Sequence, residues 1–304
     1  MTDKREFESL EGFMPIRSCA VADMFYPKDF TSCSELILEL IKSIGKVNID
    51  PNAVGALVPH AGWIFSGRTA LKALMSIDPK NAPDTFIIFG AVHHYGVNKI
   101  SIYPSGSWQT PLGNVNIDSE TVNVLQADKK LGAVLSARAH EKEHSIEVQI
   151  PFISHLFPNA KIIPIACPPI KEAYEFGVNL GDSLKNINKK FFILASSDMT
   201  HYGYNYNFLP YGDIEDAEKK VEAENDMPFI EKLKNMDYND LLYIAEKTRC
   251  ACGAGAISAT VGACKSLGAE KGVLIDYTTS NAVRDIFNTR NSSFVTYSSV
   301  LFTK

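Results

Sequence analysis

Residues 85–94 read Thr-Phe-Ile-Ile-Phe-Gly-Ala-Val-His-His, an apolar run that ends in two histidines. In two other parts of the chain, an apolar run is likewise followed by a turn that contains histidine. Residues 54–58 precede His60, and residues 191–195 precede the sequence Ser-Ser-Asp198-Met-Thr-His201. Ligands of open α/β sheets sit beyond the carboxyl ends of the parallel strands. We therefore expect these three turns to converge on one crevice.

Strand-like and helix-like segments alternate along most of the chain. Strands are expected at residues 54–58, 85–89, 99–103, 161–166, 191–195, 273–279 and 294–302. Helices are expected at 32–46 and 66–77 (with Ser32 and Ser66 as N-caps), from 118, at 145–157 with a break at Pro151, and at 171–187, 214–247 and 253–267. This alternation is typical of an α/β fold with a central, mostly parallel sheet flanked by helices. No linker or repeat interrupts it, so residues 1–304 are interpreted as a single domain, with residues 1–30 as an arm packed on the body.

The composition excludes several classes of function. The chain has 304 residues, of which 45% are hydrophobic and 21% charged, and this is ordinary for a globular protein. Its net charge of −5 gives no reason to expect a nucleic acid or an anionic membrane as partner. No apolar run approaches the roughly 20 residues of a membrane helix, and the N-terminal residues are charged, so a cytoplasmic protein with reduced cysteines is expected.

Histidines are concentrated in the three turns. Four of the seven, His60, His93, His94 and His201, lie there. Imidazoles gathered with a carboxylate are typical ligands of a first-row metal ion. Neighbouring side chains of an extended segment point in opposite directions, so only one of His93 and His94 is expected to face the site. Each residue alone has a simpler explanation, since His60 could be an ordinary loop residue and Asp198 a helix N-cap.

The sequence His140-Glu141-Lys142-Glu143-His144 matches the zinc-protease pattern H-E-x-x-H. Three features argue against a protease. The two central residues are charged, the apolar repeat of the following helix begins only at Ile146, and no third ligand follows on a recognisable second helix. His144 nevertheless remains a candidate for a residue that faces the site.

Cys252 precedes a helix rich in glycine and alanine. A helix N-terminus lowers the pKa of a thiol and favours the thiolate, which binds metals. The alternative interpretation is a buried, small apolar residue.

Taken together, the motifs resemble those of the Memo family (mediator of cell motility), whose prokaryotic members are often called the B component of the AmmeMemoRadiSam system. The resemblance covers most of the chain from about residue 54 to 302. The matching stretches are VPHAGWIFSG (58–67), FIIFGAVHHYG (86–96), WQTPLGNVNID (108–118), EHSIEVQIPF (143–152), ILASSDMTHYG (193–203) and CGAGAI (252–257).

The family is similar in fold to class III extradiol dioxygenases, which hold non-haem iron(II). The resemblance implies that His60, His93 and Cys252 are the metal ligands, with iron(II) as the metal and copper or zinc as alternatives. It also implies that Asp198 and His201 line the same pocket, with His144 nearby. Because imidazole titrates near neutral pH and a carboxylate can fix its tautomer, His201 oriented by Asp198 is interpreted as the catalytic acid–base group, and His144 as a catalytic hydrogen-bond donor to bound substrate or oxygen. The chain differs from these patterns in two places. Cys252 stands where the dioxygenases have a glutamate ligand. The N-terminal segment that often reads His-Ala-Gly-Ser-Trp-Tyr in the family reads CAVADMFY (19–26) in this chain.

These implications predict a metal-dependent oxidoreductase, dioxygenase-like, that acts on a small molecule. They also predict a functional link to a radical SAM protein and an AMMECR-type protein. The alternative from another class is a protein that binds a ligand or peptide in the same pocket without turnover, because a changed ligand set can abolish oxygen activation.

Overall fold

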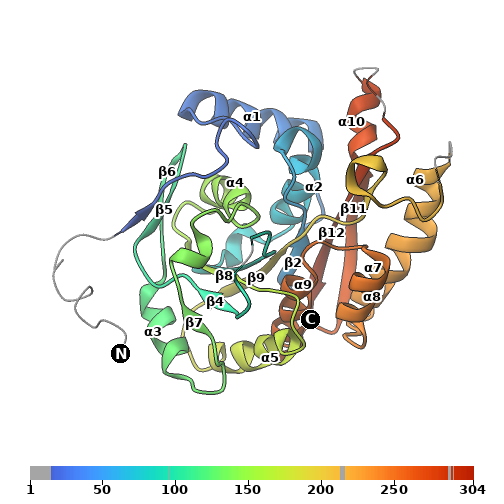
Figure 1. Cartoon of the computed structure of the whole chain (residues 1–304). Helices are drawn as coiled ribbons and strands as arrows, with labels where there is room; N and C mark the ends of the chain where they lie inside the picture. The colour runs from blue at the N-terminus through green and yellow to red at the C-terminus, as the bar shows by residue number, and fades with distance from the viewer. Residues whose placement is uncertain (1–14, 95, 213–215, 287–288, 290) are drawn as a thin grey trace.

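The centre of the fold is a row of four parallel strands (Figure 1). The computed structural model describes residues 15–94, 96–212, 216–286, 289 and 291–304. The row consists of β2 (Ala53–Val58), β9 (Phe191–Ser196), β3 (Thr85–Gly90) and β8 (Lys161–Ala166). Strands covered on both faces read as continuous apolar runs, so their positions were predictable from the sequence.

Antiparallel strands extend the sheet on both sides. β12 (Phe294–Thr303) lies beside β2 and also pairs with β11 (Lys271–Thr279) and β10 (His201–Tyr202). On the other side, β4 (Ser101–Ile102) runs antiparallel to β8 and parallel to β7 (Val134–Leu135). The sheet is therefore mixed, with the predicted parallel arrangement in its central part.

Helices cover both faces of the sheet, as predicted (Figure 1). One face carries α2 (Trp63–Met75), with α1 (Phe30–Ile44) and α4 (Ile150–Leu156) packed against it, and the other carries α9 (Ala254–Ser266) with α5 (Ala173–Leu184). The remaining helices are α3 (Ser119–Ala127), α6 (Ala217–Lys220), α7 (Met227–Lys234), α8 (Leu241–Thr248) and α10 (Ser280–Ile286), with a π-helical segment Val221–Asp226 between α6 and α7. Within the described residues, no helix combines the length and the apolar character that a bilayer-crossing segment requires.

Three predicted helix starts were wrong. The segment expected to be helical from Ser145 becomes α-helical only at Ile150, after a 3-10 turn at Glu147–Gln149, and Pro151 lies in the first turn of α4 rather than breaking it. α1 begins earlier than Ser32, because the Asp29 carboxylate accepts a hydrogen bond from the Ser32 amide at 2.9 Å and so caps the helix. α2 begins at Trp63, and Ser66 lies inside it with its hydroxyl donating to the Ala61 carbonyl at 3.0 Å.

The described part of the N-terminal arm pairs with a strand of the body, and residues 1–14 lie outside the described chain. β1 (Ile16–Arg17) pairs with β5 (Ser107–Thr110), which pairs with β6 (Gly113–Asn116) in a small separate sheet. The buried Glu147 carboxylate binds the arm through the side chain of Arg17, at 2.6 Å, and that of Tyr26, at 2.6 Å.

The strand register determines where the turns meet. Gly90, at the end of β3, lies opposite Ser196 of β9, and Ser196 lies opposite Val58 of β2. The three turns therefore leave the sheet from one edge. A Cβ atom on Gly90 would lie 2.5 Å from Ile146, so glycine is needed for the segment after His144 to approach this edge.

Candidate metal centre

Three histidines from different parts of the chain meet at this edge. His60 follows β2, His93 follows β3, and His144 lies in the turn that leads toward α4. One ligand atom of each lies within 4.8 Å of those of the other two, so the three could hold a metal ion. The ring centroids are 5.2 Å apart for His60 and His93, 5.6 Å for His60 and His144, and 4.6 Å for His93 and His144. The expected convergence of His60 and His93 is thus confirmed.

The buried hydroxyl of Ser196 defines the tautomer of His60. It donates its proton to the Ser145 carbonyl at 2.7 Å and accepts a hydrogen bond from the Gln149 amide at 3.0 Å. A hydroxyl has only one proton, so at 3.4 Å from His60 Nδ1 it accepts there as well. Nδ1 of His60 therefore carries the proton, and the lone pair of Nε2 faces the cluster.

Replacing Ser196 with Ala should weaken metal binding at this centre. We expect about a 10- to 100-fold loss of affinity, the range typical when the partner that orients a ligating histidine is removed. Competition titration with a metal-binding dye measures the change. Ser154→Ala, which removes a hydroxyl on α4 bonded to the Pro151 carbonyl, is the control. Equal affinities of the two variants would show that Ser196 does not orient His60.

Lowered pKa values keep the three histidines neutral at neutral pH, and the neutral imidazole is the form that binds metals. Desolvation lowers the pKa of His60 well below its usual value, and the neighbouring rings of His93 and His201 lower it further. Desolvation is also the main reason why the pKa of His144 falls to about 3. Desolvation also lowers the pKa of His93, although this side chain is exposed at the surface of the cluster. At neutral pH the cluster therefore presents lone pairs rather than positive charges.

Cys252 lies next to His60, but it is not one of the three described residues whose ligand atoms all lie within 4.8 Å of one another. Its Sγ is 3.4 Å from His60 Nε2, and its amide donates to the Asp198 carbonyl at 3.2 Å. A Cβ atom on Gly253 would lie 2.8 Å from the Ser197 side chain, so glycine permits this close approach. The prediction of a lowered thiol pKa was wrong, because desolvation and then the nearby Asp198 carboxylate raise the pKa of Cys252 to about 12. The helix N-terminus does not outweigh these two effects.

Asp198 and His201 line the same edge but do not form the expected pair. Oδ1 of Asp198 accepts hydrogen bonds from the amides of His60, at 2.7 Å, and Ala61, at 3.2 Å. Within the described chain, no hydrogen bond joins Asp198 to His201. His201 instead donates from Nδ1 to the Met199 carbonyl at 3.1 Å. The chain continues as coil into β10 rather than as a helical turn, so Asp198 is not a helix cap.

The H-E-x-x-H segment does not form a protease site. His140 is buried, its Nδ1 donates to the Ser136 carbonyl at 2.8 Å, and its Nε2 accepts from the Ala166 amide at 3.2 Å. Both ring nitrogens are therefore engaged with the backbone. His140 lies in a short 3-10 helix that ends before His144, so the two histidines do not share a helix face. Glu141 is exposed on the surface.

The sequence did not identify the residues that support the cluster. The buried Glu143 carboxylate accepts from the amides of Ser145, at 2.5 Å, and Ile146, at 2.9 Å, and so shapes the turn at His144. Glu147 holds the N-terminal arm and does not belong to the cluster. One feature of the sequence could have identified these residues: Glu143 and Glu147 lie on either side of Ile146, where the apolar helical repeat begins.

Comparison with known proteins gives one consistent result. A family model described as Memo-like protein matches residues 17–301. A MEMO1 family protein of Thermococcus onnurineus is 32% identical over 298 residues, with 95% of this chain and 100% of the relative covered. The corresponding proteins of Nitrosopumilus maritimus and Thermoplasma acidophilum are 33% and 34% identical, with 94% of this chain and 99% and 96% of the relatives covered.

Proposed function

The chain belongs to the Memo family, and on that premise we propose that it is a mononuclear metal protein with redox activity. The proposed metal is iron(II), and its ligands are His60, His93 and Cys252. The observation that carries the proposal is the cluster of His60, His93 and His144, with Cys252 against it.

The donor set fits a metal ion in three respects. The imidazoles are neutral, and His60 is held in the tautomer that directs Nε2 into the cluster. Two donors bound to one first-row metal ion at about 2.0–2.3 Å lie roughly 2.8–3.7 Å apart, with octahedral geometry at the lower end and tetrahedral geometry at the upper end. The 3.4 Å between Cys252 Sγ and His60 Nε2 matches this spacing. A bound iron ion would supply redox and Lewis-acid chemistry.

The other polar residues of the edge have roles in binding and proton transfer. His144 stacks on His93 and is positioned to donate a hydrogen bond to a substrate beside the ion. His201 has its Nδ1 proton bound to a carbonyl, which leaves Nε2 free to accept a proton from a substrate. Asp198 aligns the backbone at His60 through two amide hydrogen bonds. These are the roles proposed for the three predicted catalytic residues.

The resemblance to class III extradiol dioxygenases supports oxygenase-type chemistry on a small molecule. The family's prokaryotic context supports a cytoplasmic role beside a radical SAM protein and an AMMECR-type protein.

Oxygen uptake separates an oxidoreductase from a protein that only binds a ligand. Protein loaded anaerobically with iron(II) is mixed with O2 and a panel of catechols and small aromatic molecules. We expect substrate-dependent uptake in the wild type and at least about a 100-fold loss in His201→Gln, because acid–base catalysis contributes about 10²–10⁴-fold. His155→Gln, a half-buried histidine of α4, is the matched control. Tight ligand binding without uptake would instead identify a non-catalytic binding protein.

A further inference from the structure

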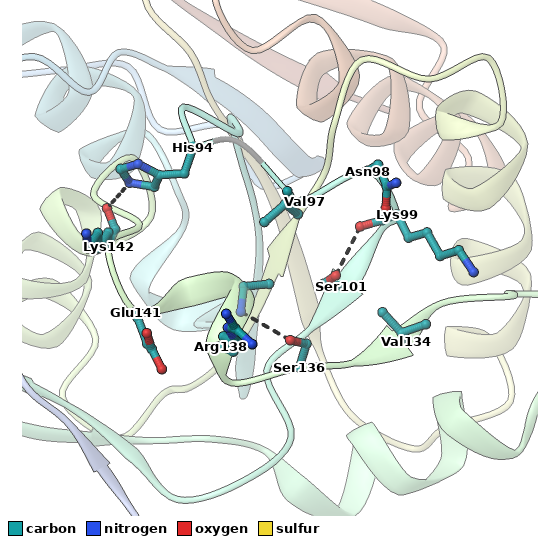
Figure 2. A pocket seen from close by; sticks show the side chains of 12 residues that line it. His94, Val97, Asn98, Lys99, Ser101, Val134, Ser136, Arg138, Glu141 and Lys142 are labelled. Carbon is teal, nitrogen blue, oxygen red and sulfur yellow. Dashed lines mark hydrogen bonds between the residues drawn. The ribbon is translucent and has the colours of Figure 1, made fainter. Parts of the chain in front are cut away.

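A cavity lies beside the histidine cluster, between the segment after His93 and the segment before His144. Its volume is about 750 Å³. Figure 2 shows its side chains, which include Asn98, Lys99, Ser101, Ser136, Arg138 and Lys142. A volume of this size is within the usual range of small-molecule sites, about 300–1,000 Å³.

The cavity has a positive lining in a negatively charged protein. Among the described residues that line it are three cations, Lys99, Arg138 and Lys142, and one carboxylate, Glu141. The chain as a whole carries a net charge of −5. Among the residues that the structure describes, no salt bridge involves any of these three cations. Their charges are therefore available to a ligand.

Hydrogen bonds hold the backbone that carries these cations. The Ser101 hydroxyl donates to the Lys99 carbonyl at 3.0 Å, and the Ser136 hydroxyl accepts from the Ala139 amide at 3.1 Å, next to Arg138. Ser101 lies in β4, and Ser136 directly follows β7, which runs parallel to β4, with its amide donating to the Ile102 carbonyl at 3.0 Å. In Figure 2, Arg138 lies between the side of the cavity with Lys142 and the side with Ser136.

One hydrogen bond joins this cavity to the metal centre. Nε2 of His94 donates to the Lys142 carbonyl across the boundary between the two sites (Figure 2). His94 follows His93 directly, and Lys142 is two residues before His144. The two chain segments that form the wall of the cavity therefore each carry a histidine of the cluster.

From these features we propose that the cavity binds the oxyanion group of a small molecule. Arginine and lysine recognise phosphate and carboxylate through charge-assisted hydrogen bonds, and the planar arginine fork suits both. The Arg138 guanidinium and the Lys142 ammonium bind the anion, while Asn98 and the two serine hydroxyls contact the polar groups beside it. The proposal does not depend on a metal in the histidine cluster.

Calorimetric titration of metal-free protein at constant ionic strength tests this site. Inorganic phosphate and succinate are the two probes, and they distinguish a phosphate from a carboxylate ligand. We expect one of them to bind, and Arg138→Gln and Lys142→Gln each to weaken that binding at least about tenfold through loss of a charged partner. Arg68→Gln removes an exposed arginine of α2 that lies outside the cavity, and it should bind as the wild type does.

Two results would overturn the proposal. One is no binding of either probe to metal-free wild-type protein that is folded by circular dichroism. The other is equal weakening by Arg138→Gln and Arg68→Gln, which would indicate a general charge effect. Because no metal is present in the titration, neither result bears on the proposed redox function.

Discussion

His60→Ala protein is expected to bind iron(II) at least about 100-fold more weakly than the wild type. The substitution removes a ligand, whereas loss of an outer partner alone costs about 10- to 100-fold. His60 is central because its Nε2 faces Cys252 Sγ at 3.4 Å and its ring contacts those of His93 and His144. Anaerobic competition with a chelator of known affinity measures the change.

The control for this prediction is again a histidine outside the cluster. His155→Gln should retain wild-type affinity. His140→Gln should also retain metal, because both ring nitrogens of His140 bond to the backbone. Loss of metal from His140→Gln with retention in His60→Ala would contradict the assignment and favour the H-E-x-x-H segment.

The largest expected effect on stability is that of Glu147→Gln. Only 2% of the Glu147 side chain is exposed, and it accepts from Arg17, from Tyr26 and from the amides of Ala20 and Val21. The substitution leaves the buried Arg17 without its counter-charge and directs an amide NH2 toward donors. Breaking a buried pair in this way costs about 3–5 kcal/mol. Urea unfolding followed by fluorescence measures the loss in the free energy of unfolding.

A surface ion pair provides the comparison. Lys185 and Asp182 are 2.8 Å apart and both about half exposed, so Lys185→Gln should cost at most about 1 kcal/mol. If Glu147→Gln costs no more than Lys185→Gln, the arm is not anchored as described. We also expect limited proteolysis to cut Glu147→Gln between residues 15 and 29 before it cuts the body.

The central strands could be predicted almost residue by residue. β8 has the predicted bounds, and β2, β3 and β9 differ by one residue, because buried parallel strands form uninterrupted apolar runs. The direction of the outer strands of the sheet could not be predicted from apolar runs. An apolar run has the same composition whether its neighbour is parallel or antiparallel, and β12 pairs in the antiparallel sense on both sides.

The histidine cluster was predictable where it depends on strand ends. His60 and His93 follow two central strands, so the topology alone brings them to one edge. The orientation of individual groups was not predictable. Whether Asp198 faces His201 or the His60 amide depends on the backbone path after β9, and the pKa of Cys252 depends on how much water reaches it. Both are determined by tertiary packing.

Proton release on metal binding tests the central claim that His60, His93 and Cys252 hold one ion. The pKa of about 12 keeps the Cys252 thiol protonated at pH 7–8, whereas the histidines are already neutral there. Thiolate ligation must therefore release one proton per metal ion, and affinity should rise about tenfold per pH unit in this range. Calorimetry in two buffers of different ionisation enthalpy counts the protons. The account predicts one proton for the wild type and none for Cys252→Ser. Release of no proton by wild-type protein that binds the metal would contradict it.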